Sequence, residues 1–227
     1  QAETGIAPVV SHAAYLLNLG TPDDALWEKS VEALADELAR AEQLGLLGVV
    51  LHPGAHMGTG EEAGLARIVA GINRAHELTP GYKTLTLVEG TAGQGTALGW
   101  RFEHLGAILE GMAAPERLGF CLDTCHMFAA GYDLRSIEAY EQTMAEFDRL
   151  CGLERLKCFH FNDAKKPLGS RVDRHDHIGT GQIGLDAFGF ILNDPRLAAV
   201  PKILETEKSD DMHEDVENLR VLRGLIR

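Results

Sequence analysis

The chain has 227 residues, of which 45% are hydrophobic and 24% charged, a balance typical of a globular protein with a sizeable core. No run of 18 apolar residues is present, which excludes a membrane-spanning helix. The net charge of −13 argues against a broadly basic surface for nucleic acids, unless bound divalent cations reverse the sign locally.

Short apolar runs alternate with longer amphipathic segments along the chain. The apolar runs predict strands at residues 5–10, 46–51, 84–88, 118–122, 156–159 and 200–204. The amphipathic segments predict helices at residues 21–44, 61–78, 100–112, 137–151, 185–192 and 211–226. Six βα units in alternation predict a parallel sheet with right-handed crossovers.

Each predicted strand is followed by a histidine, aspartate or glutamate, the residues that bind metal ions most often. These residues recur about every 40 positions along the chain. These residues are His12, His52, Glu89, Asp123, His160 and Glu205. In a TIM barrel the carboxyl ends of the strands meet at one mouth, whereas an open sheet spreads them along a line. We therefore expect an α/β fold of the TIM (β/α)8-barrel type, with about six βα units in a single domain over residues 1–227.

Three more candidate ligands lie on the loops after these strands. His126 follows Asp123 by three residues, and Asp173 and His175 are two residues apart, so that both can turn toward one ion. Imidazole and carboxylate groups without thiolate suit Zn²⁺, Mn²⁺ or Fe²⁺, and this many ligands suit two or three ions. Two alternatives stay open, namely a solvated His-rich loop and buried carboxylates neutralised by Lys or Arg.

The four cysteines lack the spacing of a disulfide framework, which favours a reduced, cytoplasmic setting. They are Cys121, Cys125, Cys151 and Cys158. Cys121 and Cys125 could be thiolate ligands, but Cys121 lies in the apolar run LGFCLD. We therefore expect packed thiols at both positions.

Seven motifs in the same order resemble the endonuclease IV family of zinc-dependent apurinic/apyrimidinic endonucleases. They are YLLNLG (15–20), LHPGAH (51–56), VEGTAGQG (88–95), LDTCHMFAAGYD (122–133), HFNDAK (160–165), GSRVDRHDHIG (169–179) and ILET (203–206). The resemblance runs from about His12 to the C-terminus. It implies a xylose-isomerase-like TIM barrel with a trinuclear zinc site, which hydrolyses the DNA backbone 5′ to an abasic site and leaves a 3′-hydroxyl.

The resemblance further implies nine ligands for three zinc ions, with Mn²⁺ as an alternative at one site. In their three groups the ligands are His12, His52 and Glu89; Asp123, His160 and Glu205; and His126, Asp173 and His175. Glu89 and Glu205 would be the catalytic carboxylates. Glu89 would bridge two ions that share a hydroxide nucleophile, and Glu205 would help to orient that nucleophile. Three Zn²⁺ ions outweigh the carboxylates and make the mouth attractive to DNA.

Flanking residues have two interpretations each. Tyr15, Asn162 and Lys165 are predicted to contact DNA, although Tyr15 could simply pack its loop and the other two could be surface residues. His56 and His177 are expected to donate hydrogen bonds beside the ligands rather than to bind metal.

The sequence departs from the family at two places without losing a ligand. Gly90 stands where the family has Asn, and the pair Ala13-Ala14 is less polar than the family loop.

The alternatives to a DNA-repair nuclease are a metal-dependent sugar isomerase or epimerase and a non-catalytic metal-binding barrel fragment. A third ion at His126, Asp173 and His175 favours the nuclease, because sugar isomerisation needs only one or two ions. The expected partner is double-stranded DNA with abasic sites, with no membrane and a monomeric state for the complete protein. Eight units at the spacing of this sequence would need roughly 300 residues, and typical barrels of this class take about 250. We therefore expect the barrel to be incomplete at its N-terminus, weakly stable and poorly active.

Overall fold

A computed structural model describes residues 3–227. These residues form two compact units. The first consists of the chain up to Glu89 together with Gly95–Cys121, and the second consists of Gly90–Gln94 together with Leu122–Arg227. All six predicted strands are present among these residues.

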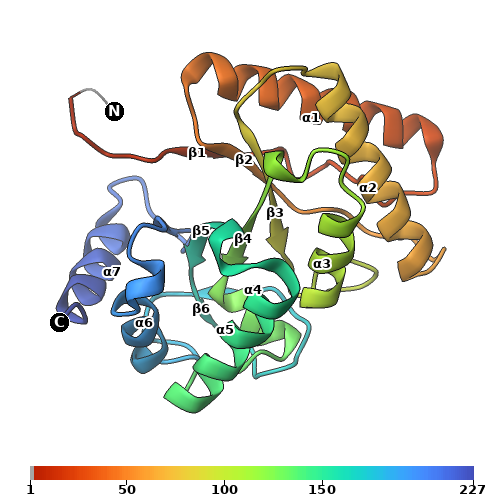
Figure 1. The fold of residues 1–227 in the computed structure, drawn as a ribbon. Helices are drawn as coiled ribbons and strands as arrows, with labels where there is room; N and C mark the ends of the chain where they lie inside the picture. The colour runs from red at the N-terminus through yellow and green to blue at the C-terminus, as the bar shows by residue number, and fades with distance from the viewer. Residues whose placement is uncertain (1–2) are drawn as a thin grey trace. The chain divides into compact units, whose positions relative to one another are not determined.

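The first unit alternates strands and helices. Its elements are β1 (Val10–His12), α1 (Asp24–Leu44), β2 (Gly48–Leu51), α2 (Glu61–Leu78), β3 (Leu85–Gly90), α3 (Phe102–Glu110), the 3-10 turn η1 (Pro115–Arg117) and the first part of β4 (Leu118–Asp123). The strand order is β1-β2-β3-β4, and β1, β2 and β3 pair in parallel. Helices α1 and α2 pack side by side in this unit (Figure 1).

Helix α1 shows why the sequence folds this way locally. Asp23 caps its first turn by accepting a hydrogen bond of 2.9 Å from the Leu26 N–H group. Gly45 ends the helix in the left-handed conformation, with φ at 65°. Between these ends a buried stripe recurs every three or four residues, at Val31, Leu34, Ala35, Leu38 and Ala41. The capping residues and the stripe together specify the helix.

The second unit carries the shorter elements. They are α4 (Thr124–Ala130), α5 (Ile137–Cys151), the 3-10 turn η2 (Leu153–Arg155), β5 (Leu156–Phe161), β6 (Asp163–Ala164), β7 (His175–Asp176), α6 (Leu185–Leu192), the 3-10 turn η3 (Pro195–Leu197), β8 (Lys202–Leu204) and α7 (His213–Gly224). Strands β5 and β8 pair in parallel, with His160 opposite Ile203. Strands β6 and β7 form a separate antiparallel pair.

Most predicted boundaries lie within about two residues of the observed ones, but one strand begins later and three short elements were missed. Strand β1 begins at Val10 rather than at residue 5, since Pro8 lacks the N–H group that a strand needs. Helix α4 was not predicted, although Asp123 caps it. Strands β6 and β7 were not predicted either, because two-residue strands have no periodicity. Among residues 3–227, no helix is both long and apolar enough to cross a bilayer.

Candidate metal centre

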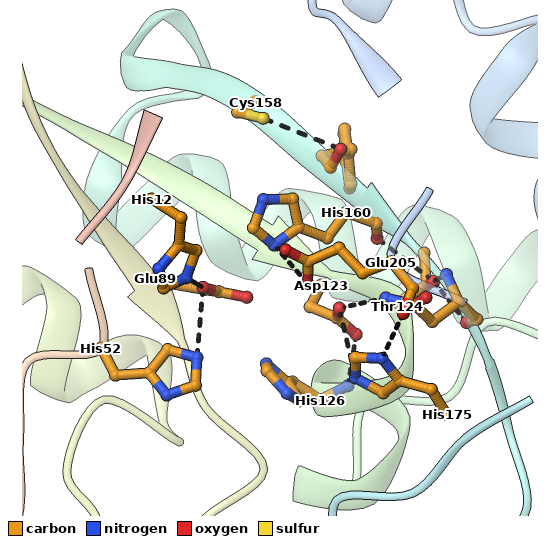
Figure 2. A network of polar contacts seen from close by, with 12 residues as sticks. His12, His52, Glu89, Asp123, Thr124, His126, Cys158, His160, His175 and Glu205 are labelled. Carbon is orange, nitrogen blue, oxygen red and sulfur yellow. Dashed lines mark hydrogen bonds and ion pairs between the residues drawn. The ribbon is translucent and has the colours of Figure 1, made fainter. Parts of the chain in front are cut away.

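His12, His52 and Glu89 converge in the first unit. Each residue lies at the C-terminal end of a different strand or directly after it. Both imidazole Nε2 atoms approach the same carboxylate oxygen, Glu89 Oε2, at 3.0 Å from His12 and 3.2 Å from His52 (Figure 2). The two rings meet edge to face, with centroids 5.5 Å apart. The Glu89 side chain is fully buried, so its charge is not screened by water.

The hydrogen bond of His12 Nδ1 indicates the protonation of Nε2, the nitrogen that faces Glu89. Nδ1 lies 2.8 Å from the backbone carbonyl of Ala13, and because a carbonyl only accepts, Nδ1 carries the proton. In the neutral ring, Nε2 then presents a lone pair to the Glu89 carboxylate. Two acceptors at 3.0 Å attract each other only through a shared proton or cation. The geometry therefore fits a metal ion between imidazole and carboxylate.

His126, Asp173 and His175 repeat this arrangement in the second unit. The Nδ1 atom of His126 lies 2.9 Å from the Gly90 carbonyl, and its Nε2 atom lies 3.2 Å from Asp173 Oδ2. The Nδ1 atom of His175 lies 3.2 Å from the Glu205 carbonyl, and its Nε2 atom lies 3.2 Å from Asp173 Oδ1. Nε2 of His175 is buried and forms no hydrogen bond of good geometry, so it fits a metal ligand. Gly90 contributes only its backbone carbonyl, a contact that does not depend on the side chain at this position.

The electrostatics of this group also favour a cation. Burial opposes ionisation of Asp173, but the contacts with His126 and His175 outweigh it and hold the pKa of Asp173 well below its usual range. Burial likewise opposes protonation of His175, but the contact with Asp173 and the charge of Asp123 raise the pKa of His175 to about 9. A metal ion can replace the proton that His175 otherwise holds.

Asp123 combines two roles at the start of α4. Its Oδ1 atom accepts a hydrogen bond of 2.9 Å from the His126 N–H group and caps the helix. Its Oδ2 atom accepts a hydrogen bond of 2.5 Å from the amide of Asn162 and lies 3.7 Å from Nε2 of His175. The sequence predicted Asp123 as a ligand but gave no indication of its capping role.

His160 and Glu205 form a third contact. Nδ1 of His160 lies 3.1 Å from Glu205 Oε2 (Figure 2). The His160 side chain is 3% exposed, whereas that of Glu205 is 33% exposed. Strands β5 and β8 are neighbours, which explains why two residues so distant in sequence meet.

The predicted DNA-contacting residues lie in different environments. Tyr15 is 82% exposed, and its ring packs edge to face on His52 with centroids 5.9 Å apart. Lys165 is exposed. Asn162 is fully buried, its amide bonded to Asp123 and its backbone N–H group to the Thr124 hydroxyl at 2.9 Å. Only Tyr15 and Lys165 therefore present their side chains to solvent, and Asn162 is placed to orient Asp123.

Two further candidates take supporting positions. His56 Nδ1 accepts hydrogen bonds from the N–H groups of Gly58 and Gly60, at 3.2 and 3.1 Å, and so orders its own loop rather than donating to a ligand. Cys125 is buried, and this burial together with the charge of Asp123 raises the pKa of its thiol to about 12. Cys125 is therefore a packed thiol, as the sequence indicated.

Asn218 of α7 supports the site although the sequence gave no sign of it. Its Oδ1 atom accepts a hydrogen bond of 3.0 Å from the Ile178 N–H group. Its Nδ2 atom donates to the Thr206 hydroxyl at 3.0 Å and lies 3.2 Å from Nδ1 of His177. Asn218 thus connects the segment after His175 with the segment after Glu205.

Three comparisons with known proteins agree on this chain's relatives. The family model of the xylose isomerase-like TIM barrel matches residues 1–225. The probable endonuclease 4 of Chloroflexus aurantiacus is 58% identical over the whole chain, which covers 80% of that protein. The crystal structure of endonuclease IV from Thermus thermophilus superposes with a TM-score of 0.84 at 42% identity, over 99% of this chain and 77% of that one.

A D-tagatose 3-epimerase-like protein superposes with a TM-score of 0.78, over 98% of this chain and 78% of that one. Its identity is only 20%, so it shows a common fold and no more. The predicted α/β fold of the TIM-barrel type, with six βα units, is confirmed by these matches. The extent of the match and the level of identity show that the chain belongs to the endonuclease IV family of the xylose isomerase-like TIM barrels.

Proposed function

We propose that this protein is a DNA-repair endonuclease that hydrolyses the phosphodiester backbone 5′ to abasic sites and uses zinc ions. The observation that carries the proposal is a repeated histidine geometry. His12, His126 and His175 each place Nδ1 against a backbone carbonyl and direct Nε2 at a carboxylate. This is the arrangement by which proteins fix a histidine as a metal ligand.

Nine residues would hold three zinc ions. They are His12, His52 and Glu89 for one ion, Asp123, His160 and Glu205 for another, and His126, Asp173 and His175 for the third. When bound, zinc supplies a hydroxide nucleophile near neutral pH and neutralises charge on the phosphate group. That Glu89 also bridges two ions stays a prediction.

The chain's own residues supply the remaining functions. Glu205 would help to orient the attacking water and accept its proton; its side chain is one third exposed, and its Oε2 atom lies 3.1 Å from Nδ1 of His160. Tyr15 offers an exposed aromatic ring that can stack where a base is missing. Lys165 offers an exposed charge to a phosphate. Double-stranded DNA with an abasic site is therefore the proposed substrate.

A duplex oligonucleotide with one tetrahydrofuran abasic analogue tests the proposal. The expected result is a single cut on the 5′ side of the analogue that leaves a 3′-hydroxyl, together with about three zinc ions per chain by atomic absorption. An intact analogue strand at enzyme excess would contradict the nuclease. Conversion of ketose sugars with one or two bound Mn²⁺ ions would favour a sugar isomerase or epimerase instead.

A further inference from the structure

Asp163, the first residue of β6, is a fully buried carboxylate that accepts hydrogen bonds only from backbone N–H groups among its described contacts. Its Oδ1 atom accepts from Ala164 at 2.8 Å and from Ile183 at 2.9 Å. Its Oδ2 atom accepts from Gly179 at 2.9 Å and from Gly184 at 3.4 Å. Three of these four donors belong to one loop, residues 179–184, which therefore wraps around a single buried anion.

Gly181 of this loop fits closely against Asp163 and Ala164. A Cβ atom added to Gly181 would lie 2.5 Å from the Ala164 carbonyl oxygen and 2.6 Å from Asp163 Oδ1. The neighbouring Gln182 N–H group donates to the same Ala164 carbonyl at 2.8 Å. The loop thus depends on both the carboxylate and the absence of a side chain at position 181.

Strand β6, which begins with Asp163, also pairs with the segment that carries the candidate ligands Asp173 and His175. In the β6–β7 pair, Asp163 lies opposite Asp176 and Ala164 lies opposite His175. The Lys165 N–H group donates to the Arg174 carbonyl at 2.9 Å, which continues this pairing to the residue between Asp173 and His175. Strand β6 therefore lies between the glycine loop and the segment that carries these ligands.

We propose that Asp163 is a positioning residue for the ion at His126, Asp173 and His175. By holding the loop that follows β7 against β6, it fixes the backbone from which His175 reaches the ion. A carboxylate is required because both oxygens accept, whereas an amide would direct an NH₂ group at two N–H donors. The inference rests on the proposed function only in taking these three residues as metal ligands.

Comparing the zinc affinity of the Asp163→Asn variant with that of the parent chain tests this role without any DNA substrate. The matched control is Asp194→Asn, because Asp194 is also a buried carboxylate of the second unit but bonds to Tyr140 and Arg196. Bound zinc is measured after dialysis against a series of zinc buffers. We expect Asp163→Asn to bind one of its ions about 10–100-fold more weakly. We expect Asp194→Asn to retain zinc like the parent.

Retention of every ion with parental affinity in Asp163→Asn would overturn the inference, and so would a parent chain that binds no zinc. If Asp163→Asn does not fold, Gly181→Ala decides, since it displaces the loop and leaves the carboxylate in place. Loss of one ion in that variant supports the role, and parental retention refutes it. A parent that binds zinc but leaves abasic DNA intact would refute the proposed function and leave this inference standing.

Discussion

The hydroxyl group of Tyr140 donates a hydrogen bond of 2.7 Å to Oδ2 of Asp194, and both side chains are buried in the second unit. Arg196 pairs with the same carboxylate, with Nη2 at 2.6 Å from Oδ2. Burial and then the contact with Asp194 raise the pKa of Tyr140, so the phenol stays protonated and donates. None of these residues belongs to the candidate metal centre, so the contact is a stabilising one.

We expect Tyr140→Phe to lower the free energy of unfolding by about 2 kcal/mol, the usual value of a hydrogen bond to a charged group. Urea unfolding followed by circular dichroism measures this loss. Zinc content and DNA cleavage should stay at parental values. A change in bound zinc would contradict the assignment of this contact to stability alone.

Stability should fall with decreasing pH because of His76. Burial and then the charge of Arg117 lower the pKa of His76 to about 4, and its Nε2 atom lies 2.8 Å from the Thr86 hydroxyl. The unfolded chain, with a pKa of 6.5 at this residue, binds more protons between pH 4 and 6.5. The free energy of unfolding is therefore highest above pH 6.5 and falls by on the order of 3 kcal/mol as the pH decreases to about 4. His76→Gln should reduce the slope of unfolding free energy against pH in this window, and an unchanged slope would contradict the prediction.

Removal of either member of the His160–Glu205 pair should abolish cleavage. We expect His160→Ala and Glu205→Ala each to reduce cleavage of the abasic duplex by more than about 100-fold, beyond the usual effect of a residue that only supports a ligand. Circular dichroism should show a retained fold. The control is His213→Ala, because His213 also pairs with a carboxylate, Asp211, at 2.7 Å but on an exposed surface. Activity within tenfold of the parent in either variant would refute the assignment.

Chelation should inactivate the protein slowly. Glu89 and Asp123 are fully buried and His126 is nearly so, which means that each ion would have to detach from at least one buried ligand before it leaves. Brief exposure to EDTA should therefore leave most activity, whereas prolonged dialysis should remove it, and added Zn²⁺ should restore it. Immediate loss that is reversed by Mg²⁺ alone would point to a different metal.

Asn162 and Lys165 should affect different quantities. Asn162→Ala should weaken metal retention about 10–100-fold, since Asp123 loses the amide that orients it. Lys165→Ala should leave the metal content unchanged. It should reduce the slope of log affinity for DNA against log salt concentration by about one. Weaker DNA binding with full metal content in Asn162→Ala would restore a direct contact between Asn162 and DNA.

The sequence predicted the helices and strands well wherever periodicity was strong, as in α1 and α2. It also predicted His12, His52 and Glu89 as neighbours, because parallel strands align their ends. It could not predict the orientation of Asn162, because burial at a loop depends on contacts such as that with Thr124, which lies 38 residues earlier in the chain. Motif similarity identifies which residues matter, whereas the direction in which each side chain points is decided by tertiary packing.

The position of Asn218 has a consequence for how variation in this chain should be interpreted. Helix α7 contains no predicted ligand and no predicted DNA contact, so substitutions there would ordinarily be ranked as harmless. Yet Asn218 is 4% exposed and bonds to the segments after both His175 and Glu205. A substitution at position 218 should therefore loosen both segments at once, although it lies in a helix without a predicted ligand.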